Sequence, residues 1–266
     1  MNTKIPNDII FDVKNLKKDY FISRGLFKEA KKIEAVKDIS FQVFQGETLA
    51  IVGESGCGKS TTANILLNIE KPTAGKIFYR GKDIATFTKE DWRMYRKKVQ
   101  IIFQDPYSSL NPRWKVGKII AEPLKLNTNL SVAEIKDKVY QIMEKVGLEK
   151  DWYHRYPHQF SGGQRQRIGI ARALVLNPEV IICDEPVSAL DVSIQAQVLN
   201  LLLDLQDEFQ LTYIFISHDL SVVEHISDRI IAMYFGDIVE SATVEDLFNH
   251  PQHDYTKKLL AAIPKI

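Results

Sequence analysis

A glycine-rich segment at residues 53–60 constrains the fold of this chain more than any other feature of its sequence. The segment reads GESGCGKS, follows the apolar run TLAIV at 48–52 and precedes a stretch of helical character at 61–69. Short apolar runs bounded by turn residues are typical of buried strands. A strand, a loop of the pattern GxxxxGK[ST] and a helix, in this order, predict a phosphate-binding site. We call residues 53–60 the glycine loop.

The residue types in the glycine loop suit a bound phosphate. Gly53, Gly56 and Gly58 can adopt backbone angles that turn successive N–H groups toward one anion. The helix that follows directs the positive end of its dipole at the same anion. We expect Lys59 to reach the β- and γ-phosphates and the Ser60 hydroxyl to bind Mg²⁺.

Two adjacent acids end a second apolar run. The residues VIIC at 180–183 read as a buried strand that delivers Asp184 to its terminus, with Glu185 next. Acids at a buried strand end are unfavourable unless a cation or a partner neutralises them. We expect Asp184 to hold Mg²⁺ and Glu185 to act as general base toward an attacking water. Together with the glycine loop, this pair predicts hydrolysis of ATP.

A further glycine-containing segment, FSGGQRQR at 160–167, opens an apolar-faced helix that runs to about Leu176. Ser161 can cap this helix, and the two glycines expose backbone N–H groups at its positive end. This arrangement predicts a second anion site. Two phosphate sites and one nucleotide per chain suggest a dimer in which each chain completes the pocket of the other.

The remaining pattern predicts an α/β fold with a mixed or parallel sheet core, an antiparallel β part and a helical subdomain. The clearest helix spans 131–147, where Ser131 and Glu134 fit a capping box, and residues 229–241 read as a hairpin. We predict further strands at 9–14, 38–44 and 213–216, a loop at 24–32 and a helix at 192–209. We predict one domain over 1–266, with a core at about 1–85 and 179–250, a helical subdomain at about 86–178 and a helical tail at about 251–266.

Composition excludes several other classes of protein. The 35 Lys and Arg against 34 Asp and Glu give a net charge of +1, which does not support binding to nucleic acid through bulk basicity. No apolar run approaches the roughly 18–20 residues of a membrane-spanning helix, and the N-terminus lacks the pattern of a signal peptide. Cys57 and Cys183 belong to no metal-binding motif, and we expect Cys57 to pack locally.

In the order and spacing of these motifs, the chain resembles the ATP-binding subunits of ABC transporters over about residues 9–263. The segment SGGQ at 161–164 is similar to the family signature, preceded by Phe160 where Leu is commonest. The resemblance implies an ABC cassette that binds ATP and Mg²⁺ and closes head to tail with a second cassette over two ATP molecules. All motifs are intact, so we expect this chain to supply a competent half to both pockets.

The resemblance also implies roles for residues that would be read as structural in isolation. It places Gln104 in the Q-loop, as a further Mg²⁺ ligand that senses the membrane subunit. It places Asp191 in the D-loop, which reaches across the dimer, and His218 as the histidine that contacts the γ-phosphate. Tyr20 stands where the family stacks an aromatic ring on adenine, and the adjacent Phe21 could take that role.

The predicted site residues form three sets. The catalytic residues are Glu185, His218 and Gln104. The metal ligands are Ser60, Gln104 and Asp184. The nucleotide-binding residues are Tyr20, Gly53, Glu54, Ser55, Gly56, Cys57, Gly58, Lys59, Ser60, Thr61, Ser161, Gly162, Gly163, Gln164 and Asp191.

Within the ABC transporters, the chain resembles the group of oligopeptide and dipeptide importers. The resemblance lies in four internal segments, at 101–113, 155–174, 184–202 and 215–229. It also includes a C-terminal motif, HPQHDYTKKLLAAIP, at 250–264. Many members continue into a Cys-rich extension, whereas this sequence ends at Ile266, and we expect no iron–sulfur or additional regulatory element. Members of the group also carry nickel, metal chelates or haem, so the resemblance leaves these cargoes open beside peptides.

The resemblance further implies partners and a location. It implies two multi-span permease subunits docked near Gln104–Pro123, a second related ATPase that favours a heterodimer, and, indirectly, an extracytoplasmic solute-binding protein. It implies no nucleic acid and a peripheral position on the cytoplasmic face of the cell membrane. The rival is a soluble ABC ATPase acting on DNA or ribosomes, which typically carries a coiled-coil or zinc-binding insertion or a second cassette. A small-molecule kinase would give no reason for the segment at 161–164.

Overall fold

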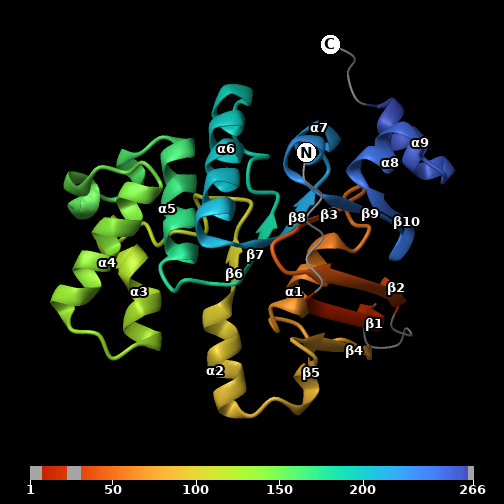
Figure 1. The fold of residues 1–266 in the computed structure, drawn as a ribbon, viewed down its shortest axis with the longest axis horizontal. Helices are drawn as coiled ribbons and strands as arrows, with labels where there is room; N and C mark the ends of the chain where they lie inside the picture. The colour runs from red at the N-terminus through yellow and green to blue at the C-terminus, as the bar shows by residue number, and fades with distance from the viewer. Residues whose placement is uncertain (1–7, 23–30, 263–266) are drawn as a thin grey trace. The chain divides into compact units, whose positions relative to one another are not determined.

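The computed structural model describes residues 8–22 and 31–262, which form two compact units (Figure 1). The first unit combines the residues up to Thr88 with those from Tyr213 onward, and the second unit runs from Lys89 to Thr212. Residues 24–30 of the loop predicted at 24–32 lie outside the described residues, and Lys31 and Lys32 belong to a strand instead. Within the described residues, every helix is too short or too polar to cross a membrane.

The first unit holds an antiparallel sheet and a set of strands centred on the strand before the glycine loop. Its strands are β1 (Ile9–Ile22), β2 (Lys31–Phe44), β3 (Thr48–Val52), β4 (Ala74–Tyr79), β5 (Lys82–Asp83), β8 (Thr212–Ser217), β9 (Arg229–Tyr234) and β10 (Asp237–Thr243). The antiparallel sheet has the order β2-β1-β4-β5. Strand β3 pairs in parallel with β8 and β9, and β10 pairs antiparallel with β9. All residues of β3 are buried, as a central parallel strand requires.

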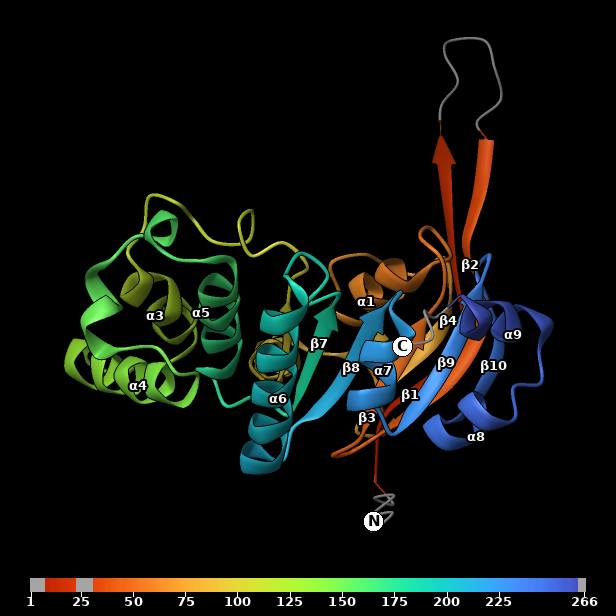
Figure 2. The same cartoon turned by 90° about the horizontal axis from the view of Figure 1, so that it is seen from above.

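The helices of the first unit follow the strands closely in sequence. They are α1 (Lys59–Leu66), α7 (Leu220–Ile226), α8 (Val244–Asn249) and α9 (Asp254–Ala261), with a 3₁₀ turn η1 at Ile84–Thr86. Helices α8 and α9 lie beside β9 and β10 in both views (Figures 1 and 2). The hairpin predicted at 229–241 is confirmed, and its turn places Phe235 and Gly236 at φ of 45° and 87°, angles that match a tight hairpin turn.

The second unit is mainly helical. Its elements are α2 (Lys89–Lys98), β6 (Val99–Ile102), α3 (Val116–Asn127), α4 (Val132–Lys145), η2 (Lys150–His154), η3 (Pro157–Gln159), α5 (Gly162–Leu174), β7 (Val180–Asp184) and α6 (Val192–Phe209). Helices α3, α4 and α5 gather side by side (Figure 1). The helix predicted at 192–209 is confirmed with the same bounds as α6.

One part of the secondary-structure prediction is wrong. The stretch 86–178 was expected to be helical, yet it contains β6, which pairs in parallel with β7 from Val99 opposite Val180 to Ile102 opposite Cys183. The four residues VQII directly follow a helix and are too short to show a strand period. Pairing with a distant buried strand therefore decides their conformation.

Helix α4 begins with the predicted capping box. The Ser131 hydroxyl accepts from the Glu134 N–H at 3.3 Å, and the Glu134 carboxylate accepts from the Ser131 N–H at 2.7 Å. We predict that Ser131→Ala lowers the free energy of unfolding by about 1 kcal/mol, measured by urea denaturation. Ser131→Asp should retain most of the stability because Asp also caps helices. A loss in both variants alike would contradict a capping role.

Candidate functional site

The glycine loop leaves the buried end of β3 and enters α1. Gly53, Gly56 and Gly58 have φ values of 148°, 81° and 110°, a region that side chains disfavour. A Cβ at Gly53 would lie 2.2 Å from the Met233 carbonyl oxygen, and a Cβ at Gly58 would lie 2.4 Å from that of Ala35. Close packing against β9 and β2 therefore requires glycine at both positions.

Lys59 turns back into the glycine loop. Its side chain is 4% exposed, and its ammonium donates to the carbonyl oxygens of Gly53 at 2.7 Å and Glu54 at 2.9 Å. Helix α1 begins at this residue after Gly58, which supplies no side-chain cap to the N–H groups of the first turn. A cation and several N–H donors at one loop form the chemistry of a phosphate site.

The thiol of Cys57 is buried within the glycine loop. The residue is 4% exposed, and burial raises the pKa of its thiol. A neutral, buried thiol is a small packing group rather than a nucleophile.

In the second unit, the structure brings together two of the predicted catalytic residues. The Gln104 side-chain amide donates to a Glu185 carboxylate oxygen at 2.9 Å. Strand β6 ends two residues before Gln104 and pairs with β7, which ends at Asp184, so the two parallel strands deliver both segments to one edge. Glu185 has a φ of 46°, which places its backbone in the left-handed region. Non-glycine residues in this region are strained and occur frequently at functional sites.

The predicted signature and D-loop segments pack against each other in the second unit. Ser161 and Gln164 form a reciprocal capping box at the start of α5. A Cβ at Gly163 would lie 2.4 Å from the Ile194 side chain, so α5 can approach α6 this closely only with glycine. The Asp191 carboxylate caps α6, and the Ile194 N–H holds the pKa of that carboxyl below its usual value. Both segments thus lie side by side at the starts of α5 and α6, and we call this region the corner.

The remaining predicted residues lie in the first unit. The Tyr20 hydroxyl donates to Glu70 at 2.5 Å, and the Lys18 ammonium lies 4.9 Å from the centre of its ring. Partial burial, with the neighbouring Glu70, raises the pKa of Tyr20. Phe21 exposes 67% of its surface. His218 is exposed immediately after β8, at the end of the strand that pairs with β3.

Two arginines of α5 hold the segment that follows Gln104, a role that no local sequence pattern indicates. The Arg165 guanidinium lies 3.6 Å from the centre of the Tyr107 ring. Arg172 donates to the Ser109 carbonyl oxygen at 2.5 Å. Arg165 is only 6% exposed, and its guanidinium also donates to the Pro157 carbonyl oxygen at 2.8 Å. The helix that starts at the signature segment is therefore tied to the Gln104 segment.

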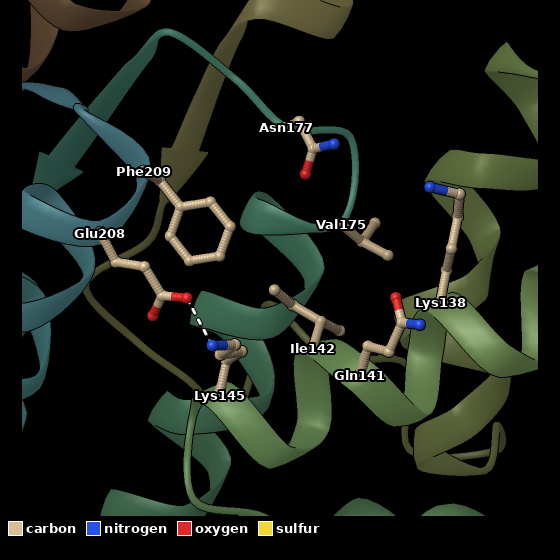
Figure 3. A pocket seen from close by; sticks show the side chains of 8 residues that line it. All are labelled: Lys138, Gln141, Ile142, Lys145, Val175, Asn177, Glu208 and Phe209. Atoms are coloured by element: carbon tan, nitrogen blue, oxygen red, sulfur yellow. Dashed lines mark hydrogen bonds and ion pairs between the residues drawn. The ribbon is translucent and has the colours of Figure 1, made fainter.

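A pocket between α4 and α6 contains none of the predicted site residues (Figure 3). It has a volume of about 180 Å³ and is lined by Lys138, Gln141, Ile142, Lys145, Val175, Asn177, Glu208 and Phe209. Lys145 and Glu208 form an ion pair across it.

A buried parallel strand, the glycine loop and the uncapped helix after it define a P-loop nucleoside-triphosphate-binding fold. The family model described as "ABC transporter" matches residues 36–188. The dipeptide transport ATP-binding protein DppF of Haemophilus influenzae is 55% identical over 265 residues, which cover 100% of this chain and 80% of that protein. The oligopeptide transport ATP-binding protein AppF of Bacillus subtilis is 51% identical, with 98% and 80% covered.

Solved structures show the same fold. A dimeric post-hydrolysis state of the ATP-binding cassette MJ0796, bound to ADP and Pi, matches with a TM-score of 0.77 and 29% identity, over 88% of this chain and 98% of that chain. The cbiO1 protein of Clostridium perfringens, part of the ABC transporter complex cbiONQ, matches with a TM-score of 0.79 and 29% identity, over 97% of both chains. The chain belongs to the ABC transporter family and is an ABC-type ATPase.

Proposed function

We propose that this chain is the ATP-hydrolysing motor of a membrane importer for dipeptides or oligopeptides, bound to the cytoplasmic face of the membrane. The observation that carries this proposal is the identity of 51–55% to DppF, OppF and AppF ATP-binding proteins of dipeptide and oligopeptide transport over at least 95% of this chain. The part of this chain that aligns with DppF of Haemophilus influenzae includes every predicted motif of the ATPase. Nickel, metal chelates and haem remain the alternative cargoes.

The residues of the glycine loop suit ATP, and three oxygen donors suit Mg²⁺. In our proposal the loop amides and Lys59 hold the phosphates. The Ser60 hydroxyl, the Gln104 amide oxygen and the Asp184 carboxylate would hold Mg²⁺, which prefers oxygen ligands. The Gln104 nitrogen is engaged with Glu185, which leaves the amide oxygen for the metal. When bound, the metal would neutralise charge on the phosphate oxygens.

Glu185 is the proposed general base. The hydrogen bond from Gln104 fixes one carboxylate oxygen at 2.9 Å and so orients the second oxygen to accept a proton from an attacking water. His218 is proposed to contact the γ-phosphate from its exposed position after β8. Tyr20, whose ring is held by Glu70 and Lys18, is proposed to stack on adenine in preference to the exposed Phe21.

The proposed active form is a head-to-tail dimer. The corner formed by the signature and D-loop segments presents Ser161 and Asp191 at the starts of α5 and α6. In our proposal this corner meets the nucleotide held by a second chain, and the dimer closes over two ATP molecules. The dimeric state of the cassette bound to ADP and Pi supports a dimer, and a related but distinct partner ATPase is favoured.

The proposed docking site for the permease is a groove in the second unit. It has a volume of about 440 Å³ and is lined by Gln100, Ser109, Asn111, Trp114, Ile119, Glu122, Pro123, Leu126, Asn127, Arg172 and Leu176. Leu126 in the groove exposes 72% of its surface, and an exposed apolar side chain in a groove is typical of interaction sites. Arg172 lines the groove and holds the segment after Gln104, so docking and catalysis would share one support.

We predict that Leu126→Asp weakens binding to the permease at least tenfold, because a charge in the groove must be desolvated on docking. ATP binding by the isolated chain should stay unchanged. Val132→Asp is the matched control, because Val132 exposes 82% of its surface and lies outside the groove. Co-purification of permease with each tagged variant measures the effect. Equal losses in both variants would contradict docking at this groove.

The function is tested by affinity purification of tagged Glu185→Gln protein from native membranes with ATP present, followed by mass spectrometry. We expect two multi-span permeases, a second ATPase and a solute-binding protein whose bound ligand identifies the cargo. Recovery of ribosomal or DNA-repair proteins alone would overturn the transporter proposal. A binding protein loaded with nickel or haem would overturn the peptide cargo and leave the motor role intact.

A further inference from the structure

The C-terminal helix α9 contacts the glycine loop through one side chain. The Tyr255 hydroxyl oxygen accepts a hydrogen bond from the Glu54 backbone N–H at 2.9 Å. Tyr255 is 6% exposed, and its ring packs on Tyr234 with 4.2 Å between ring centres. Glu54, whose N–H makes this contact, is the second residue of the glycine loop and directly follows Gly53.

Several hydrogen bonds hold the start of α9 in place and thereby fix the position of Tyr255. The Glu240 carboxylate on β10 accepts from the Gln252 N–H at 2.8 Å and from the His253 N–H at 3.0 Å. The His253 ring then accepts from the Tyr255 N–H at 3.1 Å. Partial burial opposes ionisation of Glu240, but these N–H groups hold its pKa below the usual value. A charged anchor on β10 therefore fixes the tyrosine.

A second contact holds the glycine loop from the hairpin of β9 and β10. The Gly236 N–H donates to the Cys57 carbonyl oxygen at 3.0 Å, and the Gly236 carbonyl accepts from the Lys37 N–H at 2.8 Å. The loop is thus held at Glu54 and at Cys57. The support comes from β9, β10 and α9, which begin at Arg229 or later and are therefore distant in sequence from the glycine loop at 53–60.

A cavity borders the contact between α9 and the loop. It has a volume of about 400 Å³ and is lined by Glu54, Tyr234, His253, Asp254, Tyr255, Lys258, Leu259 and Ala262. Beside this space the Tyr255 hydroxyl connects α9 to the glycine loop through the Glu54 N–H.

We propose that Tyr255 is a positioning residue for nucleotide binding, which fixes the Glu54 peptide so that the following loop amides are presented to phosphate. This inference rests on the proposed role of the glycine loop in holding ATP. Glycine adds backbone freedom to a loop, and any freedom that the loop loses on binding weakens affinity. Because the Glu54 peptide is already held in place, the loop loses less conformational freedom when the nucleotide binds.

The test is Tyr255→Phe, which removes the hydroxyl and keeps the ring. We expect affinity for ATP, measured by isothermal titration of the full chain, to fall about threefold to tenfold, the range of one hydrogen bond. Hydrogen exchange in the peptide spanning residues 53–60 should become faster without nucleotide. The melting temperature without nucleotide should stay within about 2 °C, because the ring packing on Tyr234 is retained.

Two further variants make the result decisive. Tyr140→Phe makes the same hydroxyl removal on α4, at a residue without an assigned role, and should leave affinity and loop exchange unchanged. Lys59→Ala should abolish most ATP binding, and retained binding there would overturn the role of the glycine loop and this inference with it. With Lys59→Ala behaving as expected, unchanged affinity in Tyr255→Phe would overturn the inference alone. A lowered melting temperature with faster exchange in α9 but unchanged ATP affinity would also overturn it.

Discussion

Glu185→Gln is expected to bind ATP with nearly unchanged affinity and to hydrolyse it at least about 100-fold more slowly, the usual effect of losing a general base. The substitution keeps the size of the side chain, and its amide oxygen can still accept from Gln104 as the carboxylate does at 2.9 Å. What is lost is the capacity to take a proton from water. Phosphate release under saturating ATP, together with titration of ATP, separates the two effects.

The matched control for that variant is Glu208→Gln. Glu208 is an exposed carboxylate on α6 that pairs with Lys145, and neutralising it should change neither turnover nor affinity. Hydrolysis by Glu185→Gln within a few-fold of the unaltered protein would remove Glu185 as the base. A parallel loss of ATP affinity would instead point to disruption of the site around Gln104.

Lys59→Ala is expected to weaken ATP binding about 10- to 100-fold, the range for hydrogen bonds to a charged group. The ammonium is 4% exposed and held by the carbonyl oxygens of Gly53 and Glu54, so the same buried cation is available to phosphate oxygens. Because those two carbonyls lose their partner, a moderate loss of stability should accompany the effect. Thermal unfolding without nucleotide measures that part separately.

The control is Lys76→Ala, because Lys76 is an exposed lysine on β4 of the same unit. It should leave both ATP affinity and stability close to those of the unaltered chain. ATP binding by Lys59→Ala that matches Lys76→Ala would contradict the assignment of the glycine loop as the phosphate site.

Local patterns predicted much of this molecule. The glycine loop, the acids after β7 and the capping box at Ser131 are each encoded within a few consecutive residues, and the structure shows the corresponding strand, loop and helix starts. The ABC cassette fold is likewise confirmed. The assignment of individual residues to ATP and Mg²⁺ remains a proposal, although the contact between Gln104 and Glu185 supports it.

Contacts between distant segments could not be predicted from the sequence. Strand β6 is four residues long and forms because β7 pairs with it. Arg165 lies in a polar run that suggests a solvent-facing surface, yet it is buried against Tyr107. Tyr255 and Glu54 are 201 positions apart. In each case contacts between distant segments decide the conformation or burial of the residue. The spacing of apolar residues along the sequence does not indicate such contacts.

Peptide uptake by living cells tests the central claim most directly. In cells that naturally produce this chain, deletion of its gene should abolish uptake of a labelled dipeptide or oligopeptide. The unaltered chain should restore uptake, whereas Glu185→Gln, which binds ATP without turning it over, should not. Peptide uptake that persists in the deletion, or that Glu185→Gln restores fully, would contradict an ATP-driven peptide importer powered by this subunit.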